Sequence, residues 1–98
     1  MNTTQTLTDI LIPTPLRAYT NNQARVAVAG DTVGAALNAL VQHHPLLQHH
    51  LYTEAGVLRS FVNVYVNDED IRYLDKEATV LRAGDELAIV PSIAGGRR

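Results

Sequence analysis

The first apolar pattern along the chain is an alternation with a period of two residues, and it occurs twice within the first 30 positions. Residues 6–12 are rich in Thr, Ile and Leu, and the run stops at Pro13 and Pro15, which cannot donate a backbone hydrogen bond. Residues 24–28 alternate again, after a Thr-Asn-Asn sequence at 20–22 that is typical of turns. The pattern predicts two strands that pair as a hairpin.

A helical period replaces the alternation in the next part of the chain. Apolar residues recur at the spacing that places them on one face of a helix: Val33, Ala36, Leu37, Leu40 and Val41. Asp31 or Thr32 can cap this helix, and we expect it to end near His44, before Pro45. Pro45 can also open a second, short helical turn over residues 46–51.

The second half of the chain returns to a period of two. Residues 61–66 give the strongest strand pattern, with three β-branched side chains on the side predicted to face the core: Val62, Val64 and Val66. Residues 67–70, Asn-Asp-Glu-Asp, are predicted to form a turn, and residues 71–73 a short return strand. Ala-Gly-Asp at 83–85 predicts another turn before the last strand, residues 86–90.

The predicted elements follow the order strand, strand, helix, strand, short strand, strand, and the last strand ends at Pro91. One helix across one face of a mixed sheet of four to five strands buries all of these apolar stripes together. The expected fold class is therefore α+β. Residues 1–91 form one predicted domain, and residues 92–98 a flexible tail.

The composition is that of a folded domain rather than a disordered chain. Of the 98 residues, 46% are hydrophobic and 18% charged, and the formal net charge is −2. The basic residues are scattered rather than gathered in a stripe, so we expect no nucleic-acid partner. The chain has no cysteine, which excludes disulfides and thiolate chemistry. No secretion signal and no apolar run near the roughly 20 residues that span a bilayer is present, so we expect a cytoplasmic protein without a membrane partner.

The chemistry of the chain is expected in its tail. After Pro91 the sequence continues Ser-Ile-Ala, followed by Gly95 and Gly96. Glycines have no Cβ and pass through a narrow channel in almost any backbone conformation, so this tail suits entry into another protein's active site. A Gly-Gly pair alone is also typical of a frayed chain end.

In this context, several segments resemble the ubiquitin-like sulfur carriers of the ThiS/MoaD family, which have the β-grasp fold. The resembling segments are residues 61–72, the helix entry Gly-Asp-Thr-Val-Gly at 30–34, the Gly-Asp turn at 84–85 and the Ile-Ala-Gly-Gly tail at 93–96. Within the family, residues 61–72 are most similar to the carriers of the cysteine-biosynthesis branch. The resemblance extends over nearly the whole chain.

The resemblance implies a protein co-substrate that is not itself an enzyme and has no catalytic residues. An E1-like adenylyltransferase and sulfurtransferase would use ATP to adenylate the carboxylate of Gly96, and sulfur would replace AMP to leave a thiocarboxylate. The carrier itself would bind no cofactor. In the cysteine-biosynthesis branch, a cysteine synthase-type enzyme would transfer the sulfur to an activated serine derivative. A JAMM-type metallopeptidase would then release the cysteine formed on the carrier.

The tail departs from the family pattern at one point. Arg97 and Arg98 follow Gly96, so the Gly96 carbonyl is part of an amide and cannot be adenylated as it stands. We expect a peptidase to remove the two arginines, as a JAMM-type metallopeptidase does with short extensions of some relatives. The alternatives are a cloning remnant and a carrier that has lost its role.

The resemblance also implies partner contacts on the sheet and along the tail, which here means Ile89, Pro91, Ile93 and Ala94. Ile89 could equally belong to the core. Phe61 and Tyr65 lie on the face of their strand opposite the valines, where one of them either contacts a partner or contributes to the core.

Other polar clusters have simpler explanations. Histidine pairs at 43–44 and 49–50 invite a metal-site hypothesis, but Pro45 separates them and adjacent helical residues point about 100° apart, so no metal site is predicted. The acids at 68–70 are expected to serve the turn rather than proton transfer.

Three rival functions stay open. The first is the small subunit of molybdopterin synthase, which donates sulfur in molybdenum-cofactor synthesis. The second is a ubiquitin-like modifier that forms isopeptide bonds with target lysines. The third is an interaction module that uses the sheet and not the tail.

Overall fold

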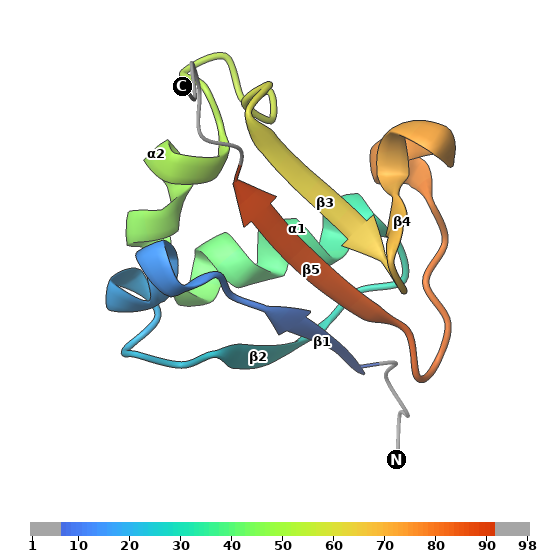
Figure 1. Cartoon of the computed structure of the whole chain (residues 1–98), viewed down its shortest axis with the longest axis horizontal. Coiled ribbons are helices and arrows are strands. Elements are labelled where there is room, and N and C mark those ends of the chain that lie inside the picture. Colours follow the sequence, from blue (N-terminus) through green and yellow to red (C-terminus); the bar gives the residue numbers. More distant parts are fainter. Residues whose placement is uncertain (1–6, 92–98) are drawn as a thin grey trace.

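A mixed sheet with a helix across one face forms the framework of the protein (Figure 1). The computed structural model describes residues 7–91. The strands are β1 (Leu7–Leu11), β2 (Arg25–Ala29), β3 (Val62–Val66), β4 (Glu69–Asp70) and β5 (Glu86–Pro91). They form a five-stranded sheet in the order β2-β1-β5-β3-β4, which confirms the predicted α+β class.

The last strand lies at the centre of the sheet. β5 runs parallel to β1 on one side and antiparallel to β3 on the other, whereas β1 and β2 form the predicted antiparallel hairpin. β4 is short and pairs only with Tyr65 and Val66 at the end of β3. The strand that leads into the tail is therefore held on both sides.

The main helix, α1 (Val33–His43), forms where the helical period predicts it. The hydroxyl oxygen of Thr32 accepts a hydrogen bond from the backbone N–H of Ala35 at 3.1 Å and caps the helix. After Pro45, a 3-10 turn and the short α2 (Gln48–Leu51) confirm the predicted second helical segment. No helix in residues 7–91 is long and apolar enough to cross a membrane.

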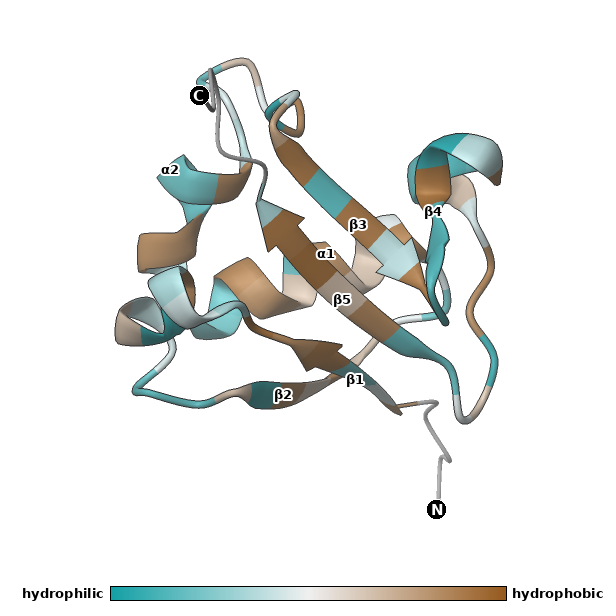
Figure 2. Ribbon diagram, in the orientation of Figure 1, coloured by the Kyte–Doolittle hydropathy of each residue, from teal (hydrophilic) through white to brown (hydrophobic). Residues whose placement is uncertain are grey.

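The core lies between α1 and the inner face of the sheet, and Figure 2 shows the alternation of apolar and polar residues along the strands. The buried face of α1 is the predicted one, and the predicted valines of β3 are buried opposite it. Ile89 is only 2% exposed and belongs to this core. Its side chain offers no surface to a partner, so of the two roles expected for Ile89 the structure supports the core.

The return from β3 differs from the prediction. The turn consists of Asn67 and Asp68 alone, which have φ values of 49° and 74°, as a two-residue hairpin turn requires. The return strand is therefore Glu69–Asp70, and Ile71–Tyr73, predicted to be a strand, forms a 3-10 helix. The cause is the Asp70 carboxylate, which accepts a hydrogen bond from the backbone N–H of Arg72 at 2.9 Å and caps that helix.

Candidate functional site: the outer face of the sheet and the end of β5

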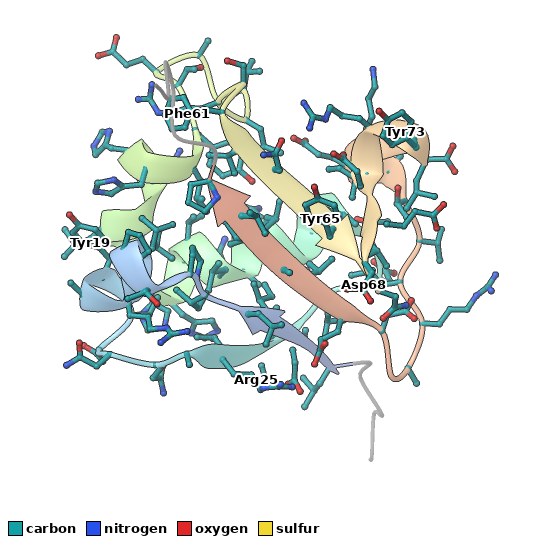
Figure 3. The ribbon with its side chains drawn as sticks, viewed as in Figure 1. Tyr19, Arg25, Phe61, Tyr65, Asp68 and Tyr73 are labelled. Carbon is teal, nitrogen blue, oxygen red and sulfur yellow. The ribbon has the colours of Figure 1, made fainter. Side chains whose placement is uncertain are left out.

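The face of the sheet opposite α1 carries a row of apolar side chains across its three central strands. The strand registers place Leu11 of β1 opposite Ala88 of β5, and Ala88 opposite Tyr65 of β3. All three are half-buried. We call Leu11, Ala88 and Tyr65 the central row; α1 lies behind the sheet in the view of Figure 3, so this face points toward the reader.

An ion-pair network bounds the central row on the β2 side. The Arg25 guanidinium contacts the Asp9 carboxylate at 3.0 Å and the Glu86 carboxylate at 2.7 Å, so one cation links three strands. Hydrogen bonds to Asp9 and then Glu86 raise the pKa of Arg25 further above its usual value. All three side chains are about half exposed, so the network orients them rather than contributing much to stability.

A second network bounds the row on the β4 side. Arg72 Nη2 contacts the Asp70 carboxylate at 2.8 Å and also donates a hydrogen bond to the side-chain oxygen of Asn63. The side-chain hydrogen bond from Arg72, followed by the one from its backbone N–H, lowers the pKa of Asp70 below its usual value. Asp70 is thus a paired carboxylate that fixes Arg72, and it is unsuited to proton transfer near neutral pH.

The end of β5 adds two exposed apolar residues to this face. Val90 is 45% exposed and Phe61, which precedes β3, is 41% exposed. Val90 pairs with Asn63 and Pro91 pairs with Val62, so the last residue of β5 lies beside the start of β3. Figure 3 shows Phe61 near this end of β5. Phe61 and the half-buried Pro91, both expected partner contacts, therefore lie at the same end of the sheet, but Pro91 shares the inner face with its partner Val62.

The other residues predicted for the site follow Pro91. Ile93, Ala94, Gly95, Gly96, Arg97 and Arg98 lie outside the described residues 7–91. What the structure shows is where their chain begins: at the end of a central strand, next to Phe61.

Sequence reasoning identified Tyr65, with Phe61, as a candidate partner contact, but it missed Leu11, Ala88 and Val90. Val90 follows the buried Ile89, so the alternation of β5 was a signal that it points outward. Leu11 and Tyr65 each lie in a predicted strand, but only the pairing of β1 and β3 with β5 shows that they flank Ala88. That information is in the register and not in any one segment.

The histidines do not converge on a metal site. The ring of His50 stacks on that of Tyr19, with 4.2 Å between centroids. The carbonyl oxygen of His49 accepts a hydrogen bond from Arg59 at 2.8 Å. Among residues 7–91, no group of three or more potential metal ligands lies close enough to hold an ion.

Comparison with known proteins agrees with the fold. The model of the ThiS family matches residues 10–96. The chain is 40% identical to the sulfur carrier protein CysO of Mycobacterium tuberculosis over 89 residues, which are 89% of this chain and 96% of that protein. It is 47% identical to small archaeal modifier protein 1 of Haloferax volcanii over 73 residues, covering 74% and 79% of the two chains.

A solved structure of the same fold comes from Amycolatopsis orientalis. The crystal structure of its BexX/CysO complex contains a chain that superimposes with a TM-score of 0.82 and 36% identity, covering 91% of this protein and 99% of that chain. The five-stranded sheet and the single main helix define the fold, and the family model matches residues 10–96. The protein is a member of the ThiS family with the ubiquitin-like β-grasp fold.

Proposed function

We propose that the protein is a sulfur carrier that receives sulfur on the carboxylate of Gly96. The observation that carries this proposal is the extent of the family match, which ends at Gly96, the residue immediately before Arg97. The relationship to CysO, which is named a sulfur carrier protein, supports it. We further propose that cysteine biosynthesis is the pathway that uses the sulfur.

The mechanism begins with hydrolysis of the bond between Gly96 and Arg97, because an amide carbonyl offers no carboxylate oxygen to ATP. Water adds across this bond, which leaves the Gly96 carboxylate and the free Arg97-Arg98 dipeptide. A metallopeptidase of the JAMM type is the proposed catalyst. The freed carboxylate attacks the α-phosphorus of ATP and releases pyrophosphate, which gives an acyl adenylate.

Sulfur then displaces AMP from the adenylate. A sulfide equivalent attacks the Gly96 carbonyl carbon, the carbon–oxygen bond to AMP breaks, and the thiocarboxylate remains on the carrier. The E1-like enzyme supplies ATP and catalytic groups, and a cysteine synthase-type enzyme later takes up the sulfur. This chain supplies an unhindered acyl group at Gly96 and the surface by which the enzyme holds it.

The outer face of the sheet is the proposed docking surface for the activating enzyme. The central row, Val90 and Phe61 form an apolar surface next to the point where the tail begins. The two ion-pair networks place charged groups at its borders, which is the arrangement of an apolar centre and polar rim found in protein interfaces. A partner docked there has the start of the tail at its edge.

Intact mass spectrometry of the protein from its native cell tests the proposal. The expected species lacks both arginines and has one oxygen exchanged for sulfur. A matched pair of purified chains, one ending at Gly96 and the other at Arg98, then separates processing from activation. Only the chain ending at Gly96 should release pyrophosphate from ATP with the activating enzyme. Equal release by both chains, or retention of both arginines in every molecule under sulfur demand, contradicts the proposal.

A second function is favoured by the relationship to small archaeal modifier protein 1. In this alternative, the activated Gly96 carbonyl is attacked by a lysine amine of a target protein and forms an isopeptide bond. A tagged chain recovered under denaturing and reducing conditions would then carry high-mass conjugates. Their absence, together with a detected thiocarboxylate, leaves sulfur transfer as the function.

A further inference from the structure

The outer edge of β3 is only partly covered. β5 pairs with β3 from Val62 to Val66, but β4 pairs only with Tyr65 and Val66. Within residues 7–91, the first half of β3 therefore has a strand neighbour on one side alone, although the Val62 backbone N–H already donates to the Arg59 carbonyl at 3.0 Å and is not available to a partner. A groove of about 470 Å3 lies along this edge, with Val62 and Val64 on one side and Ile71 on the other.

The charges around the groove are unevenly balanced. Arg59, Arg72 and Lys76 line it, together with Asp70 and Glu77. Arg72 is neutralised by Asp70 at 2.8 Å. Among the described residues, the cations that form ion pairs are Arg25 and Arg72. Arg59 and Lys76 form none there. Two cations thus face the single acid Glu77, which leaves one net positive charge.

We propose that this groove binds an extended, acidic segment of a partner protein, which adds as a strand beside Val62–Val64. An open sheet edge provides backbone groups for such an addition, and alternate side chains of the segment enter the pocket beside it. Here the apolar side chains of the segment contact the half-buried Leu58, which also lines the groove, and its carboxylates face Arg59 and Lys76. The site lies beside the outer face and shares with it the ion pair between Asp70 and Arg72.

The charge of the groove disfavours the protein's own tail, before removal of Arg97 and Arg98, as the occupant. Arg97 and Arg98 would bring two more cations toward Arg59 and Lys76, and like charges at close range repel. A partner segment with glutamate or aspartate at alternate positions has the opposite sign. Occupation of the groove by the tail is therefore the alternative that the experiment must distinguish from binding of a partner segment.

Amide NMR of the full 98-residue chain, labelled with nitrogen-15, tests the proposal. The probe is a terminally blocked hexapeptide of alternating valine and glutamate, and the control replaces glutamate by lysine. We expect saturable shifts at Val62, Val64 and Ile71 with the acidic peptide only. Equal binding of both peptides, shifts confined to the outer face, or no saturable binding overturns the proposal.

Two variants with the same change of charge locate the site. Lys76→Glu should weaken binding of the acidic peptide about tenfold, whereas Arg82→Glu, which lies outside the groove, should change it less than about twofold. Dispersed amide spectra establish that both variants fold. Equal weakening by both variants means that only overall charge matters and overturns the proposal. Binding by a chain ending at Gly96 but not by the full chain means that the tail occupies the groove, and also overturns it.

Discussion

Pro91 lies directly opposite Val62 in the antiparallel register of β5 and β3. Pro91 is the last residue of β5, so the tail begins at this pair. Phe61 precedes Val62 in the chain, so it lies near the place where the tail begins. This pairing gives the tail a fixed origin and gives that origin an exposed aromatic neighbour.

Replacement of Phe61 tests whether this neighbour holds the activating enzyme. We expect Phe61→Ala, in a chain ending at Gly96, to raise KM for adenylation about five- to tenfold with little change in kcat, because docking contacts act equally on substrate and transition state. Tyr73→Ala is the matched control, since Tyr73 is 83% exposed on the 3-10 helix beyond β4. Similar KM and kcat values for the two variants would show that Phe61 does not contact the activating enzyme.

Gly30 is predicted to be indispensable for the packing of α1 on the sheet. A Cβ at this position would lie 2.7 Å from the backbone nitrogen of Ala36 and 2.8 Å from its Cα, and helix backbone cannot rotate away. We expect Gly30→Ala to lower the free energy of unfolding by about 1–3 kcal/mol. Urea denaturation measures this change.

Gly84→Ala provides the comparison for Gly30. Gly84 has a φ of 90°, and no atom lies within 4 Å of the place that an alanine methyl group would occupy, so only its backbone conformation opposes a side chain. The expected loss is about 1 kcal/mol. If Gly30→Ala destabilises the protein no more than Gly84→Ala, the close approach of Gly30 to α1 is not what sets the packing distance.

The ion pair between Asp70 and Arg72 should make stability depend on acid pH. The folded-state pKa of Asp70 is depressed, so its contribution is present above the ordinary carboxyl pKa of about 4 and is lost as pH falls through the folded value. Asp70→Asn should therefore be less stable at pH 7 and lose less stability on acidification than the unaltered protein.

Urea midpoints at pH 7 and pH 3 check this dependence. Asp68→Asn is the matched control, because Asp68 is an exposed acid in the adjacent turn. Some acid sensitivity should persist in Asp70→Asn, since hydrogen bonds from the Arg82 backbone and the Asn67 side chain lower the pKa of Asp85 as well. An unchanged pH slope in Asp70→Asn would show that the pair does not couple folding to pH.

Tyr52 should ionise late in an alkaline titration. Burial, and then the charge of Glu77, raise the pKa of Tyr52 to about 12. Because the folded protein resists loss of this proton, the stability that Tyr52 contributes is present below about pH 10 and falls between pH 10 and the folded value. Absorbance at the phenolate band should show a late step that Tyr52→Phe removes and Tyr73→Phe leaves in place.

The elements predicted correctly are those in which local pattern and tertiary burial agree. Thr32 caps α1 at the position where the apolar period begins, and the buried face of α1 is the one that the spacing predicts. The valines of β3 are buried as their alternation indicates. In each case one stretch of sequence contains both the signal for the element and the side chains that it buries.

The features that the sequence did not predict correctly, or left open, depend on single side chains or on distant strands. Asp70 was predicted to be part of a polar turn, but its carboxylate caps the following 3-10 helix and forms an ion pair with Arg72. Ile89 becomes a core residue because the central position of β5 buries one whole side of the strand against α1. The central row needs the registers of three strands, which are separated by long stretches of chain.

The central position of β5 has a mechanical consequence. A pull on the tail acts along the axis of a strand that is bonded to β1 on one side and β3 on the other. Such a load shears both ladders at once, so their hydrogen bonds share the force instead of opening one after another as at a sheet edge. The central position of β5 thus lets the domain resist being unravelled when its C-terminal end is pulled.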